Sequence, residues 1–490
     1  MKNNVQLITY VDRLTGSNIN ELNKLLRDHF SSLFSGVHLL PFYYPIDGSD
    51  AGFDPIDHTK VDNRVGNWQD VKALGENYDV MADLIVNHMS AQSAEFQDVL
   101  NKGKGSSYWD LFLTQERVFP NGLTKSQQDK IYRPRPGSCF TKFSLPEGKS
   151  ANFWTTFTEN QIDIDVTSKS GQNYLSRILS RFAENNVNII RLDAAGYAIK
   201  KANTGCFMLE ETFGFINELT TQANNLGIET LVEIHSYYQT QIEIAKRVDQ
   251  VYDFALPPLI LHSLFNKDFS ALESWLNISP RNCITVLDTH DGIGIIDVGP
   301  MDNQPGLLTD IQIDNLVEKI HQNSKEESKK ATGAAASNVD LYQVNCTYYD
   351  ALAKCNFDYL LARAIQFFAP GVPQVYYGGL LTQTNDMELL AKTQVGRDIN
   401  RPYLTAKSVN DALQKPVTKA LIELIRIRNC CDAFNGEFSI NAQQALLTLS
   451  WTSAEASAEL SVNLVENKAD ITIKEHQEIK VIKLNELLLD

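Results

Sequence analysis

The chain has 490 residues, of which 43% are hydrophobic and 21% charged, as is typical of a soluble protein that can bury a large core. A formal net charge of −16 disfavours nucleic acid and anionic membrane surfaces, which favour clustered Lys and Arg. The chain has no apolar run of the roughly 18–20 residues that cross a bilayer, and its first residues do not resemble a secretory signal. Its seven cysteines include no C-x-x-C pair. We therefore expect a cytoplasmic location.

Short apolar runs typical of buried parallel strands alternate along the chain with segments of helical periodicity. The eight runs are 5–10, 36–40, 80–86, 187–192, 229–234, 251–254, 283–287 and 372–377. The helical segments include 20–30, 174–182, 211–226, 242–248, 357–368 and 417–427. Eight repeats predict an α/β fold, a closed (β/α)₈ TIM barrel, rather than an open doubly wound sheet. No G-x-G-x-x-G follows a strand, so nucleotide binding has no support.

Two connections are too long for simple loops, and the pattern changes again near the end of the chain. We expect barrel segments at 1–86, 167–292 and 354–433, interrupted by an inserted domain B at 87–166 and an inserted domain B′ at 293–353. Both insertions leave from the ends of strands, on the face where such barrels place their active sites. Short alternating strands at 445–451, 458–464, 469–473 and 478–484 predict a C-terminal all-β domain at 434–490.

Arg191 and Asp193 lie one residue either side of Leu192, at the end of the fourth apolar run. Residues two apart in a strand point to the same face, so a guanidinium and a carboxylate share that face. A buried charge pair needs partners or a functional reason. Taken alone, the stretch favours a structural ion pair that closes the strand.

Further polar side chains follow other strands at the same end of the predicted barrel. They are His88 after the third strand, Glu233 after the fifth, His290 and Asp291 after the seventh, Asp50 and Phe53 in the loop of the second, and Arg397 in the loop of the eighth. Each has an ordinary structural explanation by itself. Because the carboxyl ends of barrel strands share one face, together they indicate a single active site.

Three carboxylates without Cys/His metal-ligand spacing suggest glycosidic chemistry, in which one carboxylate attacks the anomeric carbon and a second protonates the leaving oxygen. We expect Arg191 to keep Asp193 ionised, as a nucleophile requires. Glu233 lies between apolar neighbours, a setting that favours the protonated form needed by an acid. Asp291 would stabilise the developing positive charge.

Four motifs in this order resemble the α-amylase superfamily of glycoside hydrolases: D-L-I-V-N-H (83–88), R-L-D (191–193), the first residue of E-I-H-S (233–236) and T-H-D (289–291). Thr289 departs from the Asn of most amylases, and the second insertion is not typical of them. Over nearly the whole chain the sequence more closely resembles the sucrose phosphorylase family, through I-Y-R-P-R-P-G (131–137), A-T-G-A-A-A-S-N-V-D-L-Y-Q-V-N (331–345), P-G-V-P-Q-V-Y-Y (370–377) and G-R-D-I-N-R (396–401).

The resemblance implies a retaining phosphorylase with Asp193 as nucleophile, Glu233 as acid/base and Asp291 as transition-state stabiliser. Its substrates and products would be sucrose, phosphate, glucose 1-phosphate and fructose, with inorganic phosphate as co-substrate and no cofactor or metal. Glucose would be held by Asp50, Phe53, His88, Phe157, Arg191, His290 and Arg397. Arg135, Asp340, Leu341, Tyr342 and Gln343, from the two insertions, would face fructose or phosphate. A homodimer is left open.

The Arg133-Pro-Arg135-Pro loop offers a local cation in an acidic protein, and the planar fork of an Arg suits phosphate. Without the resemblance, the loop is more simply an exposed basic turn. The alternatives are a related phosphorylase acting on sucrose 6′-phosphate, glucosylglycerol or glucosylglycerate, an α-glucoside hydrolase, and a non-catalytic sugar-binding barrel. A charged acceptor should recruit extra basic residues, and 340–343 contains none.

Overall fold

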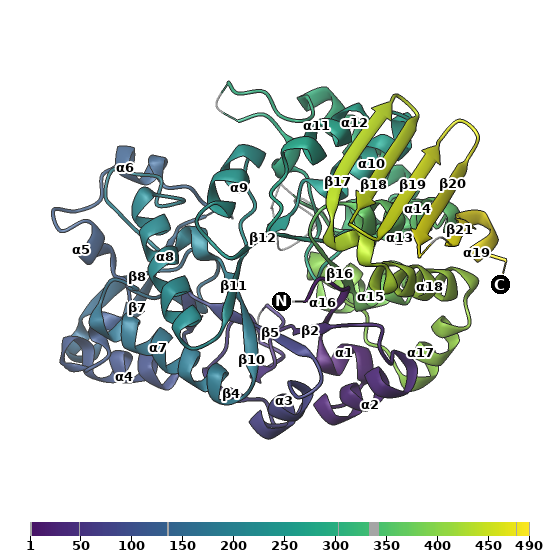
Figure 1. Ribbon diagram of the computed structural model, residues 1–490. Helices are drawn as coiled ribbons and strands as arrows, with labels where there is room; N and C mark the ends of the chain where they lie inside the picture. Colours follow the sequence, from purple (N-terminus) through teal and green to yellow (C-terminus); the bar gives the residue numbers. More distant parts are fainter. Residues whose placement is uncertain are drawn as a thin grey trace.

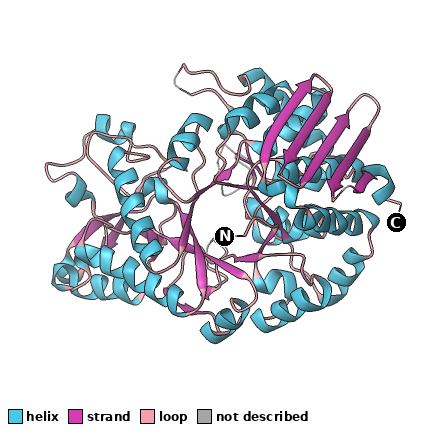
Figure 2. Ribbon diagram, in the orientation of Figure 1, coloured by secondary structure: helices cyan, strands magenta, loops and turns pink. Residues whose placement is uncertain are grey.

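The protein is described by a computed structural model at residues 2–48, 50–134, 137–301, 303–332, 343–476 and 478–489. Eight parallel strands close into a barrel in the order β1-β16-β13-β12-β11-β10-β5-β2, which confirms the TIM barrel (Figures 1 and 2). The strands are β1 (Gln6–Thr9), β2 (Gly36–Leu39), β5 (Asp79–Ile85), β10 (Val187–Asp193), β11 (Glu229–Val232), β12 (Gln250–Asp253), β13 (Cys283–Thr285) and β16 (Val372–Tyr376). Each corresponds to one of the eight predicted apolar runs.

The strands read as continuous apolar runs because both of their faces are covered. In β10, Val187, Ile189, Ile190 and Leu192 are each at most 2% exposed. The register of β10 places Arg191 beside Asp83 of β5 and beside Leu231 of β11. This register brings polar side chains from neighbouring strands together at the carboxyl end of the barrel.

Helices surround the barrel (Figure 2). They are α1 (Val11–Thr15), α2 (Ile19–His29), α3 (Trp68–Leu74), α7 (Lys169–Glu184), α8 (Glu210–Asn225), α9 (Tyr238–Ala245), α10 (Leu256–Asn266), α11 (Ser270–Ile278), α14 (Asn356–Phe368), α15 (Tyr377–Leu380), α16 (Met387–Thr393), α17 (Ala406–Leu413) and α18 (Pro416–Cys430). The helix α7 illustrates the pattern, because Ser168 caps its first turn and Tyr174, Ile178 and Phe182 form a buried stripe. None of the described helices is long and apolar enough to span a bilayer.

The first insertion follows β5 and has a small core of its own that includes Leu113, Phe119 and Trp154, while its Phe96 and Phe153 pack into the main core. Its elements are β6 (His88–Ser90), α4 (Ala94–Lys102), α5 (Gln115–Val118), α6 (Lys125–Lys130), β7 (Phe140–Ser144), β8 (Ser150–Trp154) and β9 (Gln161–Asp163). The strand β6 pairs antiparallel with β9, which returns the chain to the barrel and places His88 at its mouth.

Lys200 joins this insertion to the loop after β10. Its side chain is 1% exposed, and its Nζ lies 2.8 Å from Asp163 Oδ2 and donates to Asn87 Oδ1 at 3.0 Å. The ammonium also donates to the carbonyl of Tyr197. A buried lysine cation with oxygen partners therefore holds the first insertion, β5 and the β10 loop together.

The second insertion follows β13 and begins against the barrel mouth. It contains β14 (Ile293–Gly294), the 3₁₀ turn η5 (Ile296–Val298), α12 (Asp310–Asn323), β15 (Gln343–Val344) and α13 (Tyr348–Ala351). The strands β14 and β15 pair antiparallel, with Gln343 opposite Gly294. This pairing carries Gln343 back to the site.

The C-terminal part is a five-stranded antiparallel sheet, drawn in yellow in Figure 1, that packs beside α11 and α14. It consists of β17 (Glu437–Gln443), β18 (Leu446–Thr452), β19 (Ala456–Asn463), β20 (Lys468–Glu475) and β21 (Glu478–Lys483), followed by α19 (Leu484–Leu487). The all-β prediction is confirmed, although β17 was not among the predicted strands. Its alternating Phe438, Ile440 and Ala442 carried the signal.

Candidate active site

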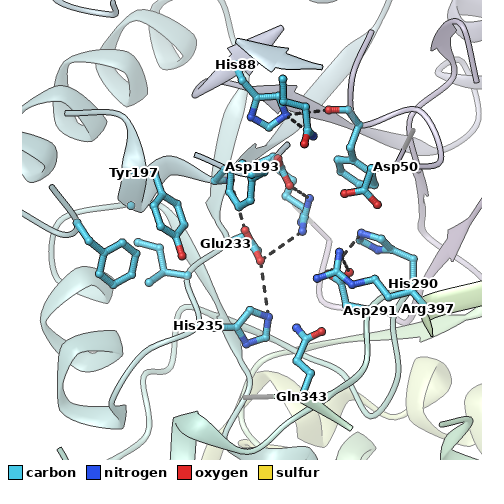
Figure 3. A pocket seen from close by; sticks show the side chains of 18 of the residues that line it. Asp50, His88, Asp193, Tyr197, Glu233, His235, His290, Asp291, Gln343 and Arg397 are labelled. Carbon is cyan, nitrogen blue, oxygen red and sulfur yellow. Dashed lines mark hydrogen bonds and ion pairs between the residues drawn. The ribbon is translucent and has the colours of Figure 1, made fainter. Parts of the chain in front are cut away.

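One pocket at the carboxyl end of the barrel gathers most of the predicted site residues (Figure 3). Its lining includes Asp50, Phe53, His88, Phe157, Arg191, Asp193, Glu233, His290, Asp291, Gln343 and Arg397. Arg135, Asp340, Leu341 and Tyr342 lie outside the described residues. Side chains separated by up to about 350 positions in sequence thus meet because barrel strands end on one face.

Arg191 connects the acidic groups at the end of β10. Its Nη1 donates to Asp83 Oδ1 at 2.6 Å and to Asp193 Oδ1 at 2.8 Å, and its Nη2 lies 3.6 Å from Glu233 Oε1. Asp83 is fully buried, but His38 and Arg191 together hold its pKa at about 2. One guanidinium is therefore shared among three carboxylates rather than paired with Asp193 alone.

Because the Arg191 guanidinium is shared with other acids, the pKa of Asp193 depends on more than this one ion pair. Burial raises the pKa of the Asp193 carboxyl; Arg191 lowers it, and the charges of Glu233, Asp83 and Asp291 raise it again. The net effect is a pKa well above the ordinary value. The expectation that Arg191 keeps Asp193 ionised was therefore wrong, because burial and the other acids outweigh the guanidinium, which also binds Asp83 and lies near Glu233.

Glu233 extends from the loop after β11 into the pocket, and its side chain is 15% exposed. Its apolar neighbours in sequence, Val232 and Ile234, are buried, and Ile234 lines the same pocket. The carboxyl group instead lies 3.6 Å from Arg191 Nη2 and 3.6 Å from His235 Nε2, and it accepts from the backbone of Ala194 at 3.4 Å. The prediction of an apolar setting was wrong for the carboxyl group itself, because a guanidinium, an imidazole and a backbone N–H are its neighbours.

Asp291 lies beside two arginines and a histidine. Its Oδ1 lies 2.9 Å from Arg397 Nη1 and 3.6 Å from Arg401 Nη2, and its Oδ2 lies 3.4 Å from His290 Nε2. Burial opposes its charge, but Arg397, His290 and Arg401 hold its pKa far below the usual range. Thr289, the departure from the amylase pattern, accepts a hydrogen bond from the Asp291 backbone at 3.1 Å and so supports the turn. Asp291 is a fixed anion.

Aromatic rings wall one side of the pocket. Phe53 stacks on His290 with ring centroids 4.9 Å apart and an interplanar angle of 9°. His88 faces Phe157 at 5.3 Å, and its Nε2 lies 2.9 Å from the carbonyl oxygen of Phe53. Burial lowers the pKa of both histidines, to about 3 for His290. Flat apolar faces beside neutral imidazoles suit the ring of a sugar.

Several lining residues were not predicted as site residues. Tyr132, Tyr197 and Phe207 form an aromatic cluster, with centroids 4.6 Å apart for Tyr132–Phe207 and 4.7 Å for Tyr197–Phe207. His235 and Ile296 also line the pocket. Tyr197 and His235 each lie within a few residues of a predicted catalytic carboxylate, so their positions in the motifs were a usable signal. Phe207 and Ile296 had none.

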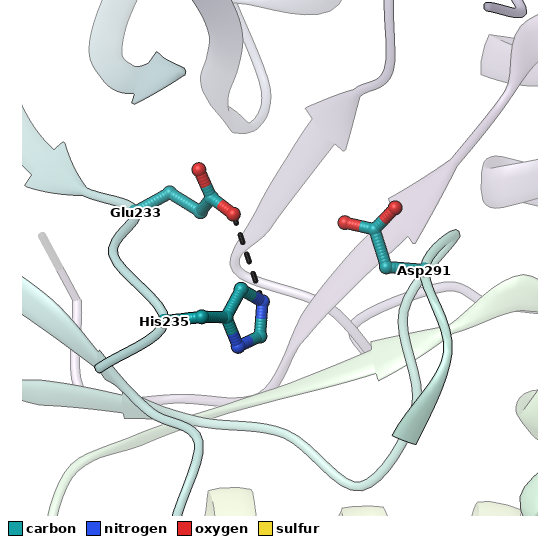
Figure 4. A group of neighbouring side chains, drawn as sticks. All are labelled: Glu233, His235 and Asp291. Carbon is teal, nitrogen blue, oxygen red and sulfur yellow. Dashed lines mark ion pairs between the residues drawn. The ribbon is translucent and has the colours of Figure 1, made fainter. Parts of the chain in front are cut away.

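Glu233, His235 and Asp291 also raise the question of a metal, because one ligand atom from each lies within 4.8 Å of the others (Figure 4). Protein groups already account for this proximity. Asp291 is paired with Arg397, and His235 Nδ1 lies 3.1 Å from Asp297. We assign no metal to the group, and the expected absence of metal chemistry stays a prediction.

Comparison with known proteins gives consistent matches. The model of the alpha-amylase catalytic domain matches residues 33–255. A sucrose phosphorylase of Agrobacterium vitis is 59% identical over 96% of this chain and 97% of its own. A sucrose phosphorylase of Bifidobacterium adolescentis is 51% identical over 94% and 92%. The crystal structure of a sucrose 6F-phosphate phosphorylase from Thermoanaerobacter thermosaccharolyticum superposes with a TM-score of 0.91 at 38% identity, over 99% of this chain and 98% of that one.

Proposed function

The chain belongs to the sucrose phosphorylase family, and from that premise we propose that it is an enzyme converting sucrose and phosphate into α-D-glucose 1-phosphate and fructose. The observation that carries the proposal is the convergence of Asp193, Glu233 and Asp291 on one pocket. A retaining glycosyl transfer requires one carboxylate as nucleophile and a second as acid/base, and Asp291 adds a third that can stabilise the transition state. The reaction is a double displacement.

In the first step Asp193 attacks the anomeric carbon of the glucosyl unit. The bond from that carbon to the fructosyl oxygen breaks, and Glu233 gives its proton to the departing oxygen. Asp291, held ionised by Arg397, stabilises the positive charge that develops on the sugar ring. The products are free fructose and a β-glucosyl ester of Asp193.

In the second step an oxygen of inorganic phosphate attacks the same carbon from the opposite face. The bond to Asp193 breaks, its electron pair returns to the carboxylate, and a proton of the phosphate passes to Glu233. Two inversions give net retention, so the product is α-D-glucose 1-phosphate. Arg191, 2.8 Å from Asp193, stabilises the carboxylate that leaves.

Glucose recognition is assigned to the walls already described. Phe53 and Phe157 contact its apolar faces, and Asp50, His88, His290 and Arg397 reach its hydroxyls. On the acceptor side, Gln343 lines the described pocket. Arg135 is proposed to bind phosphate, and Asp340, Leu341 and Tyr342 to face fructose or phosphate. Unchanged apparent phosphate affinity in Arg135→Ala would refute the assignment of Arg135.

We expect no cofactor and no metal, so prolonged dialysis against a chelator should leave the rate unchanged. A cytoplasmic location is proposed from seven cysteines that include no C-x-x-C pair. A homodimer is left to measurement of the molecular mass in solution.

The deciding experiment incubates the protein with sucrose, with and without phosphate. Glucose 1-phosphate formed only with phosphate, at a rate well above that of free glucose, supports phosphorolysis. Phosphate-independent release of glucose and fructose would identify a hydrolase. Sucrose 6′-phosphate and glucosylglycerate, tested in parallel, should be poorer substrates than sucrose, because no basic residue occurs at 340–343 to bind their charged acceptor groups. Glucosylglycerol, whose acceptor is uncharged, is compared in the same assay.

A further inference from the structure

A row of three side chains runs from the second insertion to the proposed acid. Asp297 Oδ2 lies 3.1 Å from His235 Nδ1, and His235 Nε2 lies 3.6 Å from Glu233 Oε1 (Figure 4 shows the second pair). The Asp297 side chain is fully buried, whereas His235 lines the pocket. The two nitrogens of one imidazole thus face two carboxylates, only one of which reaches the substrate space.

Two hydrogen bonds to Oδ1 hold the Asp297 side chain in place. Its Oδ1 accepts from the Ser236 backbone at 3.1 Å and from Gln241 Nε2 at 2.5 Å, which leaves Oδ2 for His235. These three partners lie on the loop and helix that follow Glu233. The first turn of the second insertion is therefore fastened to the segment that carries the acid.

The imidazole is also held by packing. His235 stacks on Phe254, with ring centroids 3.9 Å apart and an interplanar angle of 16°. A Cβ atom at Gly294 would lie 3.3 Å from His235 Nδ1, so the backbone of β14 packs close to the imidazole on that side. The ring can therefore keep its Nε2 directed at Glu233.

We propose that Asp297 is a positioning residue for the reaction: it keeps a proton on His235 Nδ1 and so directs His235 Nε2 at the carboxyl group of Glu233. The inference rests on the proposed role of Glu233 as acid/base. A carboxylate acceptor at Nδ1 selects which nitrogen carries the proton in a neutral imidazole. His235 Nε2 can then accept from protonated Glu233, and as an imidazolium it can stabilise ionised Glu233 after fructose has left.

The charges around His235 favour its protonated form. Burial lowers the pKa of His235, but Asp297 first, then Glu233 and Asp291, raise it, and the net pKa lies above the ordinary histidine value. Arg191, 3.6 Å from Glu233, is the neighbouring cation and acts in the opposite sense. Asp297 is the acid nearest to His235, so its removal should have the largest effect on the ring.

The test is Asp297→Asn, which keeps the size of the side chain and an oxygen for Ser236 and Gln241 but removes the charge. NMR of the full-length protein with labelled histidine should show that the pKa of His235 is lower by about one unit or more in the variant, as expected for loss of an adjacent opposite charge. The high-pH limb of the plot of kcat against pH for phosphorolysis should also move to lower pH. In a His235→Gln background, Asp297→Asn should add no further shift.

Asp350→Asn is the matched control, since Asp350 is another buried carboxylate, 1% exposed, bonded to Thr347 and Asn385 away from the pocket. It should leave both titrations unchanged. A His235 titration unaffected by Asp297→Asn, or shifted equally by Asp350→Asn, would overturn the proposal.

Should Asp297→Asn fail to fold, the titration in the unmodified protein decides, and a His235 pKa at or below the ordinary value overturns it. If the unmodified protein formed no glucose 1-phosphate, the proposed function would be refuted instead. The NMR result would still show whether Asp297 controls the protonation of His235.

Discussion

Arg397 is bound directly to Asp291, with 2.9 Å between Nη1 and Oδ1. The pair shows that the cation proposed to hold a glucose hydroxyl also fixes the charge of the proposed stabilising acid. We therefore expect one side chain to serve both substrate recognition and transition-state stabilisation.

Replacing Arg397 should weaken both functions. Arg397→Ala should lower kcat/KM for sucrose phosphorolysis by about 10²–10³, the usual effect of removing one preorganised electrostatic group. The matched control is Arg64→Ala, because Arg64 is half-exposed and forms a two-pronged ion pair with Asp47 outside the pocket. Initial rates over a range of sucrose concentrations measure the effect. A loss of less than about threefold would contradict the shared role.

Lys200 should be required for folding of the first insertion against the barrel. Lys200→Met leaves Asp163 buried without its cation, which typically costs about 3–5 kcal/mol. Urea unfolding should show that loss, whereas Lys149→Met, which removes a 71% exposed lysine paired with Glu147, should change stability by less than about 1 kcal/mol. Equal effects of the two substitutions would contradict the account.

His58 should make the fold sensitive to mild acid. Burial lowers its pKa from 6.5 to about 4. Between those values the unfolded chain binds a proton that the folded chain does not, so stability is full above pH 6.5 and falls as the pH decreases toward 4. From pH 7 to pH 5 the loss attributable to His58 is about 2 kcal/mol.

His58→Gln should therefore lose less stability between pH 7 and pH 5 than the unmodified protein, whereas substitution of the exposed His476 should make no difference. Free energies of unfolding at the two pH values measure this. The same slope in His58→Gln and in the unmodified protein would exclude His58 as the source.

The barrel could be predicted from the sequence because its strands are buried on both faces and so appear as continuous apolar runs. The edge strand β17 of the C-terminal sheet was harder to predict from the sequence. In β17 the alternate residues Phe438, Ile440 and Ala442 are only partly buried, whereas β18 buries its alternate residues, so the apolar pattern of β17 is weaker.

The site could be predicted as a set of residues but not as an electrostatic system. Strand ends show which groups meet, whereas the sharing of Arg191 among Asp83, Asp193 and Glu233 depends on the register of three strands. The contact of His235 with Asp297 joins positions 62 apart in the sequence, and no local pattern marks it.

The covalent role of Asp193 is tested most directly by trapping the glucosyl-enzyme. Glu233→Gln is mixed with α-D-glucosyl fluoride, whose leaving group needs no acid, without phosphate, then quenched, digested and analysed by mass spectrometry. The account predicts one glucosyl unit on the peptide that contains Asp193, lost when phosphate is added before quenching and never formed when Asp193→Asn is also present. A glucosyl unit on another carboxylate, or β-glucose 1-phosphate as the product of the unmodified protein, would contradict it.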